Sequence, residues 1–194
     1  MISDISHSSS TLADLQIRKL MKLFSMYDAD NTGVLKLHNF QTLIDRLAAL
    51  RNWKPDSPEY THLQTKFMHR WVHIRAEIKD KLKGNKDGSV TLAEWLLFYE
   101  GVLSDASYRD HINEVTNLIF DAVDVDASDT LSLPEWQQLF QIYGIPVIYA
   151  QEAFASIDLD GDHSLSKPEV LQRVEEFYYS QDPNAPGNFM FGPL

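Results

Sequence analysis

The sequence predicts an all-α fold in which four helix–loop–helix units form two packed lobes of one compact domain. Apolar residues recur at positions i, i+3, i+4 and i+7 along most of the chain, which is the spacing of amphipathic helices. Four polar turns of twelve residues interrupt this pattern, and each has a single apolar residue at its eighth position, shortly before the next helix. No segment shows the longer alternation of a sheet strand, so strands are expected only inside these turns.

The apolar stripes predict eight helices. The stripes run from Leu20 to Tyr27, Phe40 to Leu47, Tyr60 to Ile78, Trp95 to Val102, Ile112 to Ile119, Trp136 to Tyr143, Phe154 to Ile157, and Val170 to Tyr178. Ser57 and Pro58 mark the start of the third helix, because Ser caps helix N-termini and Pro is tolerated in the first turn. Gly144 marks the end of the sixth helix.

The composition restricts the class of function. Among the 194 residues, 17 Lys and Arg stand against 28 Asp and Glu, which gives a net charge of −11. Such a surface repels nucleic acids and anionic membranes, so neither is expected as a partner. The absence of cysteine excludes disulfides, thiolate metal sites and cysteine nucleophiles. The sequence shows no membrane span and no secretory signal, so a cytoplasmic location and a monomer are expected.

The polar turns fit the twelve-residue loop of the EF-hand, in which oxygen ligands come from positions 1, 3, 5, 7, 9 and 12. Calcium takes six to eight oxygens, and a bidentate Glu at position 12 clamps the ion. In the loop 124–135 the predicted ligands are Asp124, Asp126, Ser128, the Thr130 carbonyl and Glu135. In the loop 158–169 they are Asp158, Asp160, Asp162, the Ser164 carbonyl and Glu169, with Ser166 at the water-bridging position. These two loops are the predicted calcium sites.

Both of these loops lack the glycine that usually occupies position 6, where the backbone turns sharply. Asp129 and His163 stand there instead, and a left-handed conformation costs a residue with a side chain roughly 1 kcal/mol. Asp is among the residues that tolerate this conformation. The substitutions are therefore expected to affect affinity and not to prevent binding.

The loop 28–39 is predicted to be a weaker third calcium site, at which magnesium competes. Its expected ligands are Asp28, Asp30, Thr32, the Val34 carbonyl and Asn39. Gly33 supplies the turn, but Asn39 offers the clamp position one neutral oxygen where Glu offers two charged ones. The loop 83–94 is predicted to bind no metal, because Lys83 places an ammonium at position 1. Its Val90 is expected to pair with Leu35 of the first loop.

These features resemble the family of four-EF-hand proteins that includes sarcoplasmic calcium-binding proteins, calerythrin and calexcitin. The resemblance spans nearly the whole chain and rests on the four loops, the degenerate second loop, the long stretch between the first two loops, the pairs Glu94-Trp95 and Glu135-Trp136, and the tail from Asp182 to Gly192. It implies a compact two-lobed helical domain with a calcium-buffering or signal-modulating role. It also implies metal ligation by Asp28, Asp30, Thr32, Asp124, Asp126, Ser128, Glu135, Asp158, Asp160, Asp162 and Glu169.

The expected domain organisation is an N-terminal lobe of residues 1–104, a C-terminal lobe of residues 105–179 and a tail of residues 180–194. The tail is rich in Pro and Gly and ends in the apolar residues Phe189, Met190 and Phe191. We expect it to fold back so that these side chains cover an apolar seam between the lobes.

The leading functional hypothesis is an intracellular calcium buffer or modulator of calcium signals. No enzyme motif is legible, so catalysis is not expected. A sensor that binds a target protein is the alternative within the class, although five Met residues are few for a target-binding groove. A carrier of a hydrophobic small molecule is the alternative from another class. The 22 aromatic residues (four Trp, eight Tyr and ten Phe) either fill the core or line a ligand cavity.

A row of polar residues on the third helix leaves a further question open. His62, His69, His73 and Glu77 follow one another at helical spacing. A pair of His at i and i+4 can hold zinc or copper. The alternative, which we favour from the sequence, is a solvent-facing row opposite Trp71 and Ile74.

Overall fold

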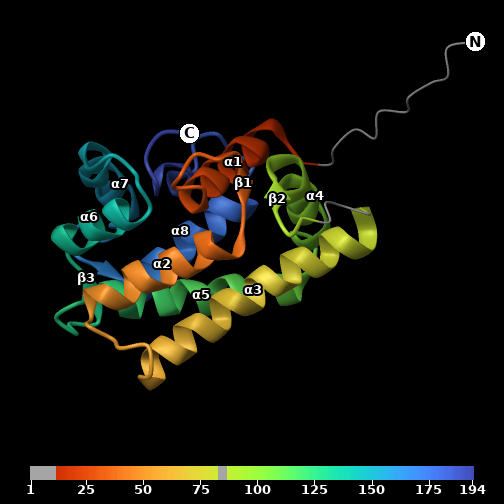
Figure 1. Cartoon of the computed structure of the whole chain (residues 1–194). Coiled ribbons are helices and arrows are strands. Elements are labelled where there is room, and N and C mark those ends of the chain that lie inside the picture. The colour runs from red at the N-terminus through yellow and green to blue at the C-terminus, as the bar shows by residue number, and fades with distance from the viewer. Residues whose placement is uncertain (1–11, 83–86) are drawn as a thin grey trace, which may run out of the picture.

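The all-α prediction is confirmed by a computed structural model, which describes residues 12–82 and 87–194 (Figure 1). The described helices are α1 (Asp14–Tyr27), α2 (Leu37–Leu50), α3 (Pro58–Leu82), α4 (Leu92–Val102), α5 (Ala106–Val123), α6 (Leu133–Ile142), α7 (Ala150–Ile157) and α8 (Lys167–Tyr179). There are also two short 3₁₀ helices. η1 (Val147–Tyr149) precedes α7, and η2 (Pro186–Phe189) lies in the tail. No helix in this part of the chain combines the length and apolarity that a membrane span requires.

Two-residue strands join the loops in pairs. β1 (Val34–Leu35) pairs antiparallel with β2 (Val90–Thr91), and β3 (Thr130–Leu131) pairs with β4 (Leu165–Ser166). Leu35 lies opposite Val90, as predicted, and Leu131 lies opposite Leu165. All four side chains are at most 1% exposed. The apolar eighth position of each loop therefore anchors the loop in the core and fixes its register with its partner.

The helix boundaries follow the sequence signals. The Ser57 hydroxyl accepts a hydrogen bond of 3.2 Å from the Tyr60 amide and caps α3, which starts at Pro58. Gly144 adopts a φ of +67° directly after α6, the left-handed conformation that ends many helices. Local side-chain chemistry thus sets where these helices begin and end.

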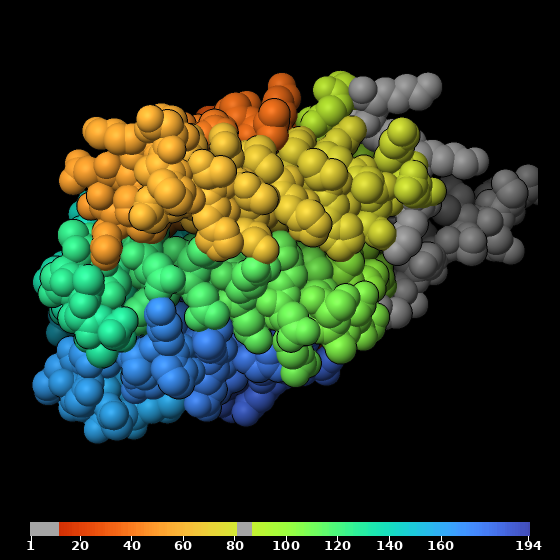
Figure 2. All heavy atoms as spheres, turned by 90° about the horizontal axis from the view of Figure 1, so that it is seen from below, coloured from red at the N-terminus to blue at the C-terminus, as the bar shows by residue number. Residues whose placement is uncertain are grey.

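The helices of both halves of the chain share one hydrophobic core. α2 packs against α3, α5 and α6, and α1 packs against α4 and α8. Figure 2 shows α3, α5 and the C-terminal region side by side as yellow, green and blue bands. Trp95 and Trp136 are 0% and 1% exposed, so the aromatic residues do fill core positions. Because the core is continuous, the division at residue 104 stays a prediction.

The tail lies on α7 and α8. Met190 is 1% exposed, and the ring of Phe191 lies 5.2 Å from that of Phe177 on α8. Phe189 differs from the expectation, because it is 44% exposed and does not cover an apolar seam. The tail meets the N-terminal half through α1, where Lys22 donates a hydrogen bond of 3.3 Å to the Pro193 carbonyl.

Candidate metal centres

The loop 124–135 begins where α5 ends. The Asp124 amide donates to the Phe120 carbonyl at 2.9 Å, which completes the last turn of α5. The Asp124 carboxylate then accepts hydrogen bonds from the amides of Ser128 (3.0 Å) and Asp129 (3.1 Å). These bonds curl the loop around the first ligand, so that the carboxylates at positions 1 and 3 face the same interior.

Glu135 ties the two ends of this loop together. Its Oε1 accepts from the Val125 amide at 2.8 Å, and its Oε2 accepts from the amide and hydroxyl of Ser132 at 2.8 and 2.7 Å. Ser132 is also the N-cap of α6, so the clamp residue is part of the capping box that starts the helix. The calcium clamp is therefore positioned by the ordinary chemistry of a helix N-terminus.

The donor set of this loop fits calcium. Carboxylate oxygens of Asp124, Asp126 and Glu135 all lie within 4.8 Å of one another. Calcium–oxygen distances are 2.3–2.6 Å, so ligands on opposite sides of one ion are at most about 5 Å apart. Asp124 and Glu135 are each only 6% exposed, which makes two adjacent carboxylates costly without a cation between them. The site would hold calcium through Asp124, Asp126 and Glu135.

The loop 158–169 repeats this construction. The Asp158 carboxylate accepts from the amides of Gly161 (2.8 Å) and His163 (3.1 Å). Glu169 accepts from the amides of Leu159 and Ser166, both at 2.8 Å. Carboxylate oxygens of Asp158, Asp160 and Asp162 lie within 4.8 Å of one another. The second donor set is therefore also made of oxygens gathered around one point.

Hydrogen bonds favour the ionised form of two carboxylates in this loop. The side chain and amide of Ser164 lower the pKa of Asp162. Burial acts to raise the pKa of Glu169, but the hydrogen bonds from Ser166 and Leu159 outweigh burial and lower it. Both groups are thus charged at neutral pH, as calcium ligands must be.

The backbone of these loops is left-handed at position 6, as expected. Asp129 has a φ of +63° and His163 has a φ of +68°. Position 4 is left-handed as well, with Ala127 at +57° and Gly161 at +74°. The strain at Ala127 was not predicted from the sequence, although an Ala where the last loop has Gly could have indicated it.

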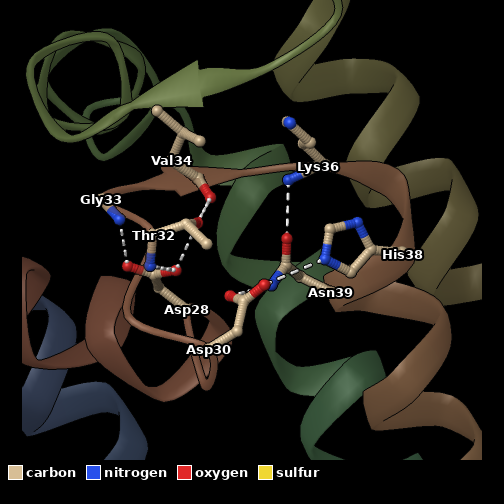
Figure 3. A network of polar contacts seen from close by, with 8 residues as sticks. All are labelled: Asp28, Asp30, Thr32, Gly33, Val34, Lys36, His38 and Asn39. Carbon is tan, nitrogen blue, oxygen red and sulfur yellow. Dashed lines mark hydrogen bonds and ion pairs between the residues drawn. The ribbon is translucent and has the colours of Figure 1, made fainter.

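The loop 28–39 has the same outline but different chemistry at its clamp (Figure 3). The Asp28 carboxylate accepts from the amides of Thr32 (3.0 Å) and Gly33 (2.8 Å), at the same two loop positions as Asp124 in its loop. The Asn39 Oδ1 accepts from the Lys36 amide at 2.8 Å, which is the bond that Glu135 makes to Ser132. The one side-chain oxygen of Asn39 is therefore used in the hydrogen bond that caps α2.

The other group of the Asn39 amide is a donor, and it points at a predicted ligand. Its Nδ2 donates to Asp30 Oδ1 at 3.1 Å, and His38 Nε2 lies 3.2 Å from Asp30 Oδ2 (Figure 3). The contacts with His38 and Asn39 lower the pKa of Asp30. Polar hydrogens from the chain itself thus occupy both oxygens of Asp30, which a calcium ion would otherwise contact.

The loop 83–94 is described only from Asp87 onward. The prediction for Lys83 lies outside the described residues. Glu94 accepts from the amide of Thr91, the N-cap of α4, at 2.9 Å, and Asp87 accepts from the Ser89 amide at 2.8 Å. Within residues 12–82 and 87–194, the groups of three or more carboxylate or imidazole ligands gathered within 4.8 Å are those of loops 124–135 and 158–169.

One contact that joins the two halves was missed from the sequence. The Arg51 guanidinium, just after α2, donates a hydrogen bond to the main-chain carbonyl of Asp124. Arg51 also lies 5.9 Å from the centre of the Trp53 ring. No local pattern could indicate this contact, because the two partners are 73 residues apart.

Known proteins share this fold over most of the chain. No family model matches. Calerythrin from Saccharopolyspora erythraea is 22% identical over 166 residues, covering 84% of this chain and 92% of calerythrin. A sarcoplasmic calcium-binding protein from amphioxus has a TM-score of 0.72 at 16% identity, covering 94% of this chain and 99% of that one. The chain is a calcium-binding EF-hand protein.

The resemblance to the calerythrin and sarcoplasmic calcium-binding protein family is thereby confirmed. Further curated relatives of this EF-hand protein are 31–33% identical, but it spans only 40–55% of their length. A coelenterazine-binding protein from Renilla muelleri, solved in its calcium-loaded apo form, shares the fold with a TM-score of 0.65 at 17% identity. The match covers 94% of this chain and 100% of the Renilla chain.

Proposed function

We propose that this EF-hand protein is an intracellular calcium buffer with two calcium sites, in loops 124–135 and 158–169. The observation that carries the proposal is the clamp. In each of these loops a Glu at position 12 accepts from the amide of position 2 and from position 9, which holds the loop closed around its carboxylates. A calorimetric titration of the full chain with calcium should give two equivalents per chain. Binding of no calcium would contradict the proposal.

The loop 28–39 is the weaker third site in this proposal, where magnesium competes. Asp28 and the Gly33 turn have the EF-hand arrangement, but the Asn39 amide already satisfies Asp30. A cation entering this loop must break the bond between Asn39 and Asp30 and gains only a neutral oxygen in return. Third-site binding should therefore appear only at calcium concentrations well above those that fill the other two sites. A third equivalent as tight as the first two would overturn this ranking.

A buffer is favoured over a sensor by what fills the C-terminal lobe. Sensors expose an apolar groove when they bind calcium, whereas buffers barely open. Here Met190 and Phe191 line an apolar cavity of about 50 Å³ together with Trp136 and Leu139 of α6. Because these two tail residues form part of the cavity wall, a partner helix that bound here would have to displace them. Dye fluorescence that rises strongly on calcium addition would instead support the sensor.

The apolar cavity beside Met190 gives the carrier hypothesis little support. Pockets for drug-sized ligands are about 300–1,000 Å³, far larger than the apolar cavity beside Met190, which is about 50 Å³. The coelenterazine-binding protein from Renilla, which has the same fold, supports this alternative. Native mass spectrometry of the purified full chain tests the alternative, because a carrier would retain an organic ligand of defined mass.

A further inference from the structure

Three histidines meet at a pocket away from the EF-hand loops. The pocket has a volume of about 220 Å³ and lies between α3, the end of α4 and the start of α5. His69 and His73 come from α3, and His111 comes from α5. The sequence indicated only the row on α3 and favoured solvent exposure for it. His111 adds a third imidazole because α3 and α5 run side by side (Figure 2).

Two of the three ring pairs are nearly as close as rings that share one metal ion. The ring centres of His69 and His111 are 5.6 Å apart, and those of His69 and His73 are 6.4 Å apart. Two imidazoles on one tetrahedral zinc, with zinc–nitrogen distances of 2.0–2.1 Å, have centres about 5 Å apart. The ligand atoms are not all within 4.8 Å of one another, as they are in the two calcium loops, so the side chains must rotate to bind one ion. His69 is exposed and therefore free to turn.

The pocket also contains an unsatisfied nitrogen and two carboxylates. His111 Nε2 is buried and has no hydrogen-bond partner among the described residues, which is costly for a polar atom. Glu77 lies one helical turn after His73, with its Oε1 4.0 Å from His73 Nε2, and Asp105 lines the same pocket. A cation in the pocket would give the His111 nitrogen a partner and would face negative charge.

We propose that His69, His73 and His111 form a site for Zn²⁺ or a neighbouring divalent first-row metal ion, with Glu77 as a fourth ligand. Imidazole nitrogen suits Zn²⁺ and its late first-row neighbours, whereas Ca²⁺ and Mg²⁺ prefer oxygen ligands. The pair His69 and His73 has the i, i+4 spacing at which two imidazoles on one helix bind a single zinc. The site is chemically distinct from the EF-hand loops and is independent of the proposed buffering function.

The surrounding charges do not all favour a cation. The guanidinium of Arg70 is buried and acts on His111 strongly enough to help lower its pKa, after burial, to about 4. Glu114, which also acts on His111, and the pocket carboxylates Glu77 and Asp105 oppose this positive charge.

The test is a titration of the calcium-saturated full chain with ZnCl₂, followed by calorimetry and by NMR of the histidine rings. Saturation with calcium keeps zinc from the carboxylates of the loops. One equivalent of zinc should bind, and the ring signals of His69, His73 and His111 should shift. The signals of His38 and His62 should stay in place.

Two variants and a matched control locate the site. His111→Ala and the exposed-residue variant His69→Ala should each weaken zinc binding by at least about tenfold. Loss of a residue that only supports a ligand already costs about 10–100-fold in metal affinity, so loss of a ligand should cost at least the smaller of these values. His62→Ala removes an exposed imidazole from the same helix outside the pocket and should change nothing. Calcium stoichiometry reports whether each variant is folded. Zinc binding that is absent, or unchanged in both pocket variants, would overturn the proposal.

Discussion

The side chain at position 12 determines how each described EF-hand loop is closed. Glu135 and Glu169 use one oxygen for the helix cap and one for the start of the loop, so each ties the two ends of its loop together. Asn39 keeps the cap bond but turns its amide nitrogen toward Asp30. One change of residue thus replaces a charged acceptor by a donor, which opposes cation binding.

Restoring the carboxylate should convert the first loop into a full site. Asn39→Glu keeps the acceptor that caps α2, removes the donor to Asp30 and adds a charged oxygen. We expect calorimetry to show a third calcium equivalent whose affinity rises at least about tenfold, equal to 1.4 kcal/mol. Asn39→Gln is the matched control, because it has the same length without the charge. Equal calcium binding by the two variants would show that the clamp charge is not what limits this loop.

Strain at Ala127 gives a second prediction for a single residue. Its φ of +57° costs a residue with a Cβ about 1 kcal/mol, and Gly removes that cost. Ala127→Gly should therefore raise the free energy of unfolding of the calcium-loaded protein by about 1 kcal/mol, measured by urea denaturation. Ala155→Gly, at an exposed position in α7, should lower it by a similar amount. A loss of stability in both variants would contradict the assigned strain.

At the scale of the elements, the packing of the C-terminal tail against α8 depends on one glycine. A Cβ on Gly187 would lie 2.5 Å from the Arg173 carbonyl and from Glu176 Cβ, both on α8. Gly187→Ala should push η2 away from α8 and withdraw Met190 and Phe191 from the apolar cavity that they line. We expect a loss of about 1–3 kcal/mol in unfolding free energy and stronger binding of an apolar dye. The exposed tail variant Asn184→Ala should leave both unchanged, and unchanged values for Gly187→Ala would refute the docking.

A buried lysine links α1 to the end of α8. Lys19 is 1% exposed, and its Nζ donates to the carbonyls of Glu176 (3.1 Å) and Ser180 (2.8 Å). Burial, opposed by the charge of Glu176, lowers the pKa of Lys19 from 10.5 to about 8. Between these two values the unfolded chain binds more protons than the folded chain. The contribution of Lys19 to stability should therefore rise with pH across that window.

The measurement is the unfolding free energy of the native chain minus that of Lys19→Met, determined with urea at several pH values between 7.5 and 10. The difference should grow with pH, with a slope of at most about 1.4 kcal/mol per pH unit. Lys79→Met, which changes an exposed lysine on α3, should show no such trend. A flat difference for Lys19→Met would mean that the amine is charged and well solvated in the fold.

The elements themselves were largely predictable, because their determinants are local. Helical spacing, the Ser57 cap and the Gly144 stop each act within a few residues, and the eighth loop positions gave the pairing of Leu35 with Val90. What escaped prediction depends on contacts between distant segments. The meeting of His111 with His69 and the bond from Arg51 to the Asp124 carbonyl arise only when the helices pack. The orientation of the Asn39 amide likewise depends on where Asp30 lies.

For the whole molecule, calcium binding and folding are coupled through charge. Two calcium ions would change the formal net charge from −11 to −7 (−11 + 4), which reduces self-repulsion. The paired strands join each loop to a partner, and all four loops border one core. Occupancy of the two sites should therefore stabilise the entire chain and not only the C-terminal lobe.

The central claim is that the clamps of loops 124–135 and 158–169 hold the bound calcium. The most direct test is calorimetric calcium titration of the native chain beside the double variant Glu135→Gln/Glu169→Gln, with the exposed-residue variant Glu152→Gln as control. The native chain and the control should each take up two equivalents with the same affinity, and the double variant should lose this binding. Calcium uptake by the double variant with unchanged stoichiometry and affinity would contradict the claim.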